Sequence, residues 1–237
     1  MPWGLGKVVQ VVVLWIFGFA FVALVGVPFV QVLTGLDAPS TSAWQVTSFT
    51  FCIDIMEFLV AFGVVRATLR EFDLTRLNLW KVKVRGLWPL AVALLCLTFP
   101  LVNLAAEVNR GAFHTSGWIW APPNFASKSF GEVSANVALI CWTTLMSPVW
   151  EEFLFRGFLL RSLRKQLPSS VAIVVSSFVF ALLHFSPATM LPLLLLGVIF
   201  GALFVKTNNL LACMLLHTLW NVYAFWVAAT NTYALPL

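Results

Sequence analysis

The chain has 237 residues, of which 61% are hydrophobic and only 10% are charged, and its mean hydropathy is +0.95. Soluble globular domains carry about 25% charged residues, so this composition excludes a water-soluble globule, a disordered chain and a nucleic-acid-binding protein. The net charge of +5 reflects scarce acidic residues, as expected of loops that face an anionic membrane leaflet. We therefore predict an all-α, multi-pass membrane protein.

Seven stretches are apolar over the length of about 20 residues that a membrane-spanning helix needs. They cover residues 8–33, 42–65, 87–106, 134–160, 168–186, 189–205 and 209–230. The runs are continuous, whereas strands of a membrane β-barrel would show short alternating segments. We expect them to form a single helical membrane domain over residues 1–237.

Lysine and arginine gather in the connections on one side of these predicted spans. Six lie in residues 66–85, three lie in residues 161–165, and Lys206 follows the sixth span, whereas the intervening loops are nearly neutral. Basic loops stay on the cytoplasmic side of a membrane. The distribution predicts a cytoplasmic N-terminus and a C-terminus outside.

Polar residues inside membrane spans are costly and mark functional sites. Three of the predicted spans carry such residues at helical spacing, namely Glu151, Glu152 and Arg156 in the fourth, Phe180 and His184 in the fifth, and His217 and Asn221 in the seventh.

Residues four apart share a helix face, so Glu152 should pair with Arg156. By the same spacing, Phe180 should place its ring beneath the His184 imidazole, and His217 should project together with Asn221. Glu151 and Glu152 are about 100° apart around the helix axis. One acid should therefore face the reaction centre while the other is held by Arg156.

These residue types suit hydrolysis of a carbonyl compound by water. A carboxylate with a histidine can position and deprotonate a water molecule. A second histidine and an asparagine one turn apart can donate hydrogen bonds to a developing oxyanion. This reading needs no cofactor.

Two alternatives stay open. Glu151, His184 and His217 are the residue types of a three-ligand catalytic zinc site, although no H-E-x-x-H sequence is present. The same polar residues would also serve a non-catalytic membrane protein, such as an immunity factor, a scaffold or a proton-coupled transporter.

Two further features lie outside these motifs. Asp54 and Glu57 are acids within the second predicted span, three residues apart and therefore on one helix face. We expect a supporting role for them rather than a catalytic one. The GxxxG sequence from Gly197 to Gly201 predicts close packing of two helices within the monomer.

The ordered patterns EExxxR, FxxxH and HxxxN resemble those of the CAAX protease and bacteriocin-processing family, also called the CPBP or ABI family. It comprises intramembrane endopeptidases and includes the type II CAAX prenyl endopeptidases. The resemblance covers about residues 135–225, the expected catalytic core. It implies a multi-pass protein of the cell membrane that acts on a peptide or a lipid-modified protein.

Transferred to this chain, the resemblance implies that Glu151 activates the water together with His184. His217 and Asn221 would form the oxyanion site, and Glu152 with Arg156 would hold the helix geometry. Members of the family have been described both as metalloproteases and as glutamate-type proteases. We favour the metal-free mechanism, because the His217–Asn221 pair then has a clear role as oxyanion donors.

Overall fold

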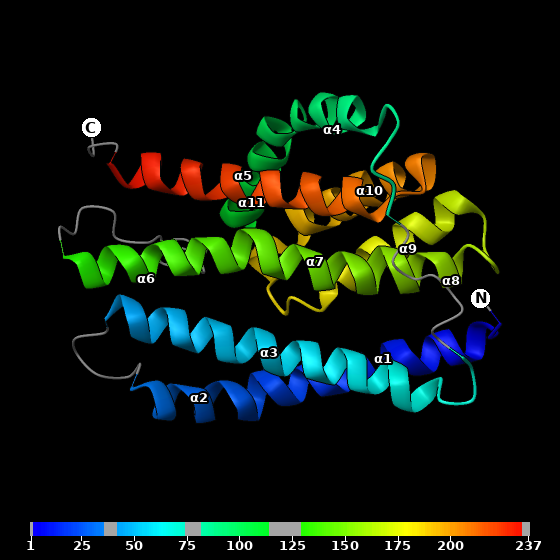
Figure 1. Ribbon diagram of the computed structural model, residues 1–237, viewed down its shortest axis with the longest axis horizontal. Coiled ribbons are helices and arrows are strands. Elements are labelled where there is room, and N and C mark those ends of the chain that lie inside the picture. The colour runs from blue at the N-terminus through cyan, green and yellow to red at the C-terminus, as the bar shows by residue number, and fades with distance from the viewer. Residues whose placement is uncertain (1, 36–41, 74–81, 114–128, 234–237) are drawn as a thin grey trace.

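The computed structural model describes residues 2–35, 42–73, 82–113 and 129–233. All regular elements in these ranges are helical, which confirms the predicted all-α membrane bundle. The α-helices, coloured along the chain in Figure 1, are α1 (Leu5–Phe21), α2 (Val27–Thr34), α3 (Ala43–Thr68), α4 (Trp88–Cys96), α5 (Phe99–Phe113), α6 (Phe130–Cys141), α7 (Ser147–Glu152), α8 (Arg161–Leu163), α9 (Ser169–Leu182), α10 (Met190–Thr207) and α11 (Leu210–Tyr233). Wider π-helical turns, η1 (Val22–Gly26), η3 (Trp142–Met146) and η4 (Phe153–Leu160), join α1 to α2, α6 to α7 and α7 to α8.

Among the described residues, five helices are long and apolar enough to cross a membrane. They are Leu5–Thr34, Ala43–Thr68, Phe130–Leu163, Pro187–Thr207 and Leu210–Val227. A sixth span arises if α4 and the first part of α5, which meet at a bend of 43°, are taken together. The predicted count of seven is not confirmed.

The fifth predicted span, 168–186, contains a helix that is too short to count as a membrane span. It forms α9, whose 14 residues make about 21 Å of helix, less than the hydrocarbon thickness of about 30 Å. The helix ends at Leu182, and the chain turns at Phe185, which has a φ of +48°. Apolar residues continue up to this turn, so hydropathy alone could not reveal that the helix stops at Leu182.

The basic connections lie at one end of the bundle wherever the structure describes them. At that end Trp3 donates to the Ser162 hydroxyl at 3.1 Å, and Lys7 donates to the carbonyl of Thr68 at 3.3 Å. Lys83 donates to the carbonyl of Thr207 at 3.1 Å. This end holds the N-terminus in Figure 1, and its assignment to the cytoplasm stays a prediction.

Helix α3 runs parallel to the long helix formed by α6, η3 and α7 (Figure 1). Thr47 donates to the carbonyl of Ala135 at 3.0 Å near the start of both helices. Further along, the rings of Phe62 and Phe153 stack at 5.1 Å. The helix that carries Glu151 and Glu152 is therefore supported along its length by α3.

Helices α9 and α10 approach each other closely at two glycines of α10. A Cβ atom at Gly197 would lie 2.7 Å from Ser177 Cβ and 2.9 Å from Ser177 Cα, and one at Gly201 would lie 3.1 Å from Ile173. This contact confirms that the GxxxG sequence packs two helices of the same chain.

We expect Gly197→Ala to push α10 away from α9, because the added methyl group would meet backbone and Cβ atoms of Ser177. Overpacking of this kind costs about 1–3 kcal/mol, so the unfolding temperature should fall by roughly 2–12 °C. Thermal unfolding in detergent checks this. Gly63→Ala is the matched control, since nothing lies within 4 Å of a Cβ at Gly63, and an equal loss in both variants would contradict the explanation.

Candidate active site

Glu152 occupies the centre of the polar cluster. Its side chain is fully buried, and its Oε1 atom accepts a hydrogen bond from Arg156 Nη1 at 2.9 Å and one from His217 Nδ1 at 2.9 Å. The contact with Arg156 is the pair expected from the four-residue spacing. The contact with His217 joins α7 to α11 across 65 residues of sequence.

Arg156 extends this cluster toward α10 and α9. Its Nη2 atom donates to the carbonyl of Gly197 at 3.2 Å. Its guanidinium carbon lies 4.9 Å from the centre of the Phe180 ring and 5.3 Å from that of Phe200. Because a buried cation needs partners on every side, these contacts explain how an arginine that is 1% exposed is accommodated.

His184 lies in the exposed turn just after α9. Its Nδ1 atom is 2.8 Å from the carbonyl oxygen of Phe180, and the two rings are 4.8 Å apart at their centres. A carbonyl oxygen only accepts, so Nδ1 carries the proton. In the neutral imidazole, Nε2 then presents its lone pair and can accept a proton.

The ring of His217 is also held by a hydrogen bond from its Nδ1 atom to an acceptor. Because Glu152 Oε1 takes the Nδ1 hydrogen, Nε2 is the atom of His217 that can meet a substrate. Nε2 becomes a donor only in the doubly protonated imidazole. The ring centres of His217 and Phe180 are 6.2 Å apart, which brings α11 and α9 together at the site.

Asn221 lies one turn beyond His217 and binds the wide turn η3. Ser147 donates its backbone N–H to the carbonyl of Trp142, five residues earlier. Pro148 has no N–H to continue this pattern to the carbonyl of Thr143. Asn221 Nδ2 donates to that carbonyl at 2.8 Å. An amide nitrogen has two hydrogens, so one of them stays available for a substrate oxygen.

Glu151 differs from its neighbour in burial and bonding. It is half-buried, and its carboxylate forms no hydrogen bond within the part of the chain that the structure describes. Its carboxylate interacts electrostatically with four charged side chains, those of Asp54, Glu57, Glu152 and Arg156. The structure therefore brings Glu152, Arg156, Phe180, His184 and His217 into one cluster and leaves Glu151 beside it, on the side of α3.

Sequence reasoning missed the residues that support the motifs. Thr143 and Gly197 take part through backbone carbonyls, and Phe200 through its ring. Only Pro148, inside a predicted span, signalled a disturbed helix and therefore a carbonyl in need of a donor.

The zinc alternative requires Glu151, His184 and His217 to converge. Within the described ranges, no group of three or more His, Cys, Asp or Glu side chains is placed to hold a metal ion. In this arrangement the three residues do not fit a three-ligand zinc site.

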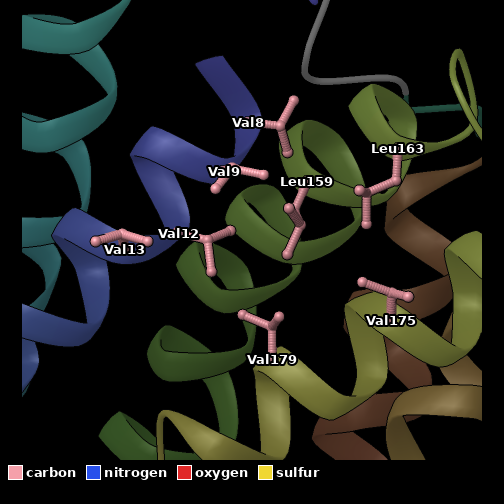
Figure 2. A pocket seen from close by; sticks show the side chains of 8 residues that line it. All are labelled: Val8, Val9, Val12, Val13, Leu159, Leu163, Val175 and Val179. Carbon is pink, nitrogen blue, oxygen red and sulfur yellow. The ribbon is translucent and has the colours of Figure 1, made fainter. Parts of the chain in front are cut away.

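A hollow of about 130 Å³ lies away from these residues, between α1, α9 and the helical segment formed by η4 and α8 (Figure 2). All of its lining side chains are aliphatic, as Figure 2 shows: Val8, Val9, Val12, Val13, Leu159, Leu163, Val175 and Val179. Such a lining offers no group for acid–base chemistry or for binding an oxyanion. The hollow is therefore not the candidate active site.

Comparison with known proteins gives one positive result. Residues 133–223 match the family described as Type II CAAX prenyl endopeptidase Rce1-like. No curated protein and no solved structure matches the chain. The matched segment spans α6 to α11 and includes every polar residue of the cluster. Residues 133–223 are thus similar to the Rce1-like type II CAAX prenyl endopeptidases, the group that the sequence motifs resemble.

Proposed function

We propose that this protein is an intramembrane endopeptidase of the cell membrane that hydrolyses a peptide bond in a lipid-modified protein or peptide. The observation that carries the proposal is the different state of its two adjacent acids. Glu152 is fully buried and held by Arg156 and His217, whereas Glu151 is half-buried and forms no hydrogen bond within the described residues. A general base must be reachable by a water molecule, and of the two acids the half-buried Glu151, whose carboxylate no described residue holds by a hydrogen bond, suits this role better.

In the proposed reaction, Glu151 takes a proton from a water molecule whose oxygen attacks the carbonyl carbon of the scissile bond. His184 Nε2 accepts a hydrogen bond from the second O–H group of this water and thereby orients the molecule. No direct contact joins Glu151 and His184 among the described residues, and a water molecule is what would bridge them. The proton on Glu151 then passes to the leaving nitrogen as the carbon–nitrogen bond breaks.

The oxyanion that forms would be stabilised by His217 and Asn221. His217 is a donor at Nε2 only when doubly protonated, because its Nδ1–H is directed to Glu152. Asn221 would contribute the amide hydrogen that Thr143 does not use. Loss of one such donor typically costs 10²–10³-fold in rate.

The proposal is tested with the purified full chain in lipid nanodiscs. Three fluorogenic peptides serve as probes: a CaaX peptide, the same peptide carrying a prenyl group, and an unmodified leader peptide. We expect cleavage of the prenylated peptide, with one oxygen from labelled water in the new carboxylate. We also expect 1,10-phenanthroline to change the rate less than about twofold, because the proposed site uses no metal.

Two outcomes would contradict these expectations. A rate lost with phenanthroline and restored by zinc would replace the metal-free mechanism by a metal-dependent one. Absence of cleavage of all three peptides, together with solute uptake into proteoliposomes, would instead favour the transporter alternative.

A further inference from the structure

Asp54 lies in the middle of α3, outside the three motifs and outside the matched residues 133–223. Its Oδ2 atom accepts a hydrogen bond from Trp142 Nε1 at 2.6 Å and another from Ser147 Oγ at 2.9 Å. A carboxylate in a membrane-spanning helix is costly unless its partners are well placed. Here one oxygen atom joins α3 to two points on the neighbouring helix.

These two points mark the limits of the wide turn η3. Trp142 is its first residue, and Ser147 is the first residue of α7. A π-helical turn is less regular than an α-helix, and such turns occur mostly at functional sites. Asp54 holds η3 from the side of α3, and Asn221 holds it from the side of α11.

The bond to Ser147 also determines which way α7 faces. Ser147 and Glu151 are four residues apart and share one helix face. When Ser147 is held against Asp54, Glu151 faces α3. This orientation agrees with the electrostatic interaction of Glu151 with the α3 residues Asp54 and Glu57. Glu152, about 100° further around the axis, then meets His217 on α11. A rotation of α7 would displace both acids at once.

We infer that Asp54 is a positioning residue that fixes the rotation of α7, and thereby the placement of Glu151, by accepting hydrogen bonds from Trp142 and Ser147. The inference rests on the proposed function, since Glu151 is the catalytic base there. The contact of the Phe51 ring with the Trp142 ring, with centres 4.5 Å apart and planes tilted by 58°, supports the same contact between the helices.

The test compares three variants of the full chain in nanodiscs. Asp54→Ala removes the acceptor, and we expect kcat to fall about 10–100-fold with little change in KM, because misplacement of a catalytic group by about 1 Å has an effect of this size. Asp54→Asn keeps an oxygen that can accept both bonds and should retain kcat within about threefold. Thr47→Ala is the matched control. It removes another hydrogen bond from α3 to the same long helix, but at Ala135, far from Glu151.

The possible results separate the inference from its alternatives. Retention of kcat in Asp54→Ala would overturn the inference. Equal losses of kcat in Asp54→Ala and Asp54→Asn would overturn it as well, because they would show that the negative charge of Asp54 matters rather than its hydrogen bonds. A kcat loss in Thr47→Ala as large as in Asp54→Ala would show a general effect of weakened helix packing.

A second readout does not depend on cleavage, so it survives failure of the proposed function. The indole N–H resonance of Trp142, identified by its disappearance in Trp142→Phe, should shift in Asp54→Ala and stay in place in Thr47→Ala. An unchanged resonance in Asp54→Ala would overturn the hydrogen bond itself. An absence of cleavage by the unaltered protein would count against the proposed function alone.

Discussion

Glu151→Gln should reduce peptide cleavage by about 10³-fold, within the range of 10²–10⁴ that general acid–base catalysis contributes. The substituted amide cannot take a proton from water, but it has nearly the same size and shape as the acid. The fold should persist, because the Glu151 carboxylate forms no hydrogen bond within the described residues. Initial rates and thermal unfolding, measured on the same nanodisc preparation, check both statements.

Glu57→Gln is the matched control for this prediction. Glu57 is also half-buried, lies on α3 and belongs to the carboxylates that act on Glu151. The same chemical change there should leave kcat within about threefold, because Glu57 would neither receive the proton nor contact the substrate. If Glu151→Gln cleaves at the rate of the unaltered protein while folded, Glu151 is not the base.

The local part of the site could be predicted from spacing alone. A four-residue interval places two side chains on one helix face. It led to the Glu152–Arg156 ion pair and to the contact of Phe180 with His184, both of which the structure contains. Glycine spacing likewise indicated the close packing of α10. Each of these inferences needs only the geometry of one helix.

Contacts between different helices could not be predicted from residue spacing within one helix. The sequence places His217 and Asn221 on one face, but it does not show that His217 meets Glu152 or that Asn221 meets a carbonyl of η3. Such contacts depend on helix rotation and depth, which hydropathy leaves undetermined. The early end of α9 at Leu182 belongs to the same class, because apolar residues continue past it.

The largest effect on stability is expected from Glu152→Gln. The change removes the negative charge between Arg156 and His217, and it leaves a guanidinium that is 1% exposed without its counter-ion. Removing one partner of a buried ion pair costs about 3–5 kcal/mol, so the unfolding temperature should fall by roughly 6–20 °C. Cleavage should fall about 10²-fold as well, because His217 then meets a neutral amide in place of the carboxylate that orients its ring for oxyanion binding.

The matched control for stability is Glu71→Gln. Glu71 forms an ion pair with Lys7 at 3.1 Å, but the two side chains are 55% and 38% exposed. Exposed pairs contribute about 0–1 kcal/mol, so this variant should unfold within about 4 °C of the unaltered protein. Equal losses in the two variants would mean that burial does not govern the effect, and the central place of Glu152 would be wrong.

A double variant separates the two roles of Glu152. Replacing a buried ion pair by apolar side chains of similar volume is often neutral or stabilising, so Glu152→Leu combined with Arg156→Met should recover much of the lost stability. It should not recover cleavage, because His217 would still lack the acceptor that holds its Nδ1 atom and orients its ring. Recovery of both would show that the ion pair supports only the fold and that His217 acts without Glu152.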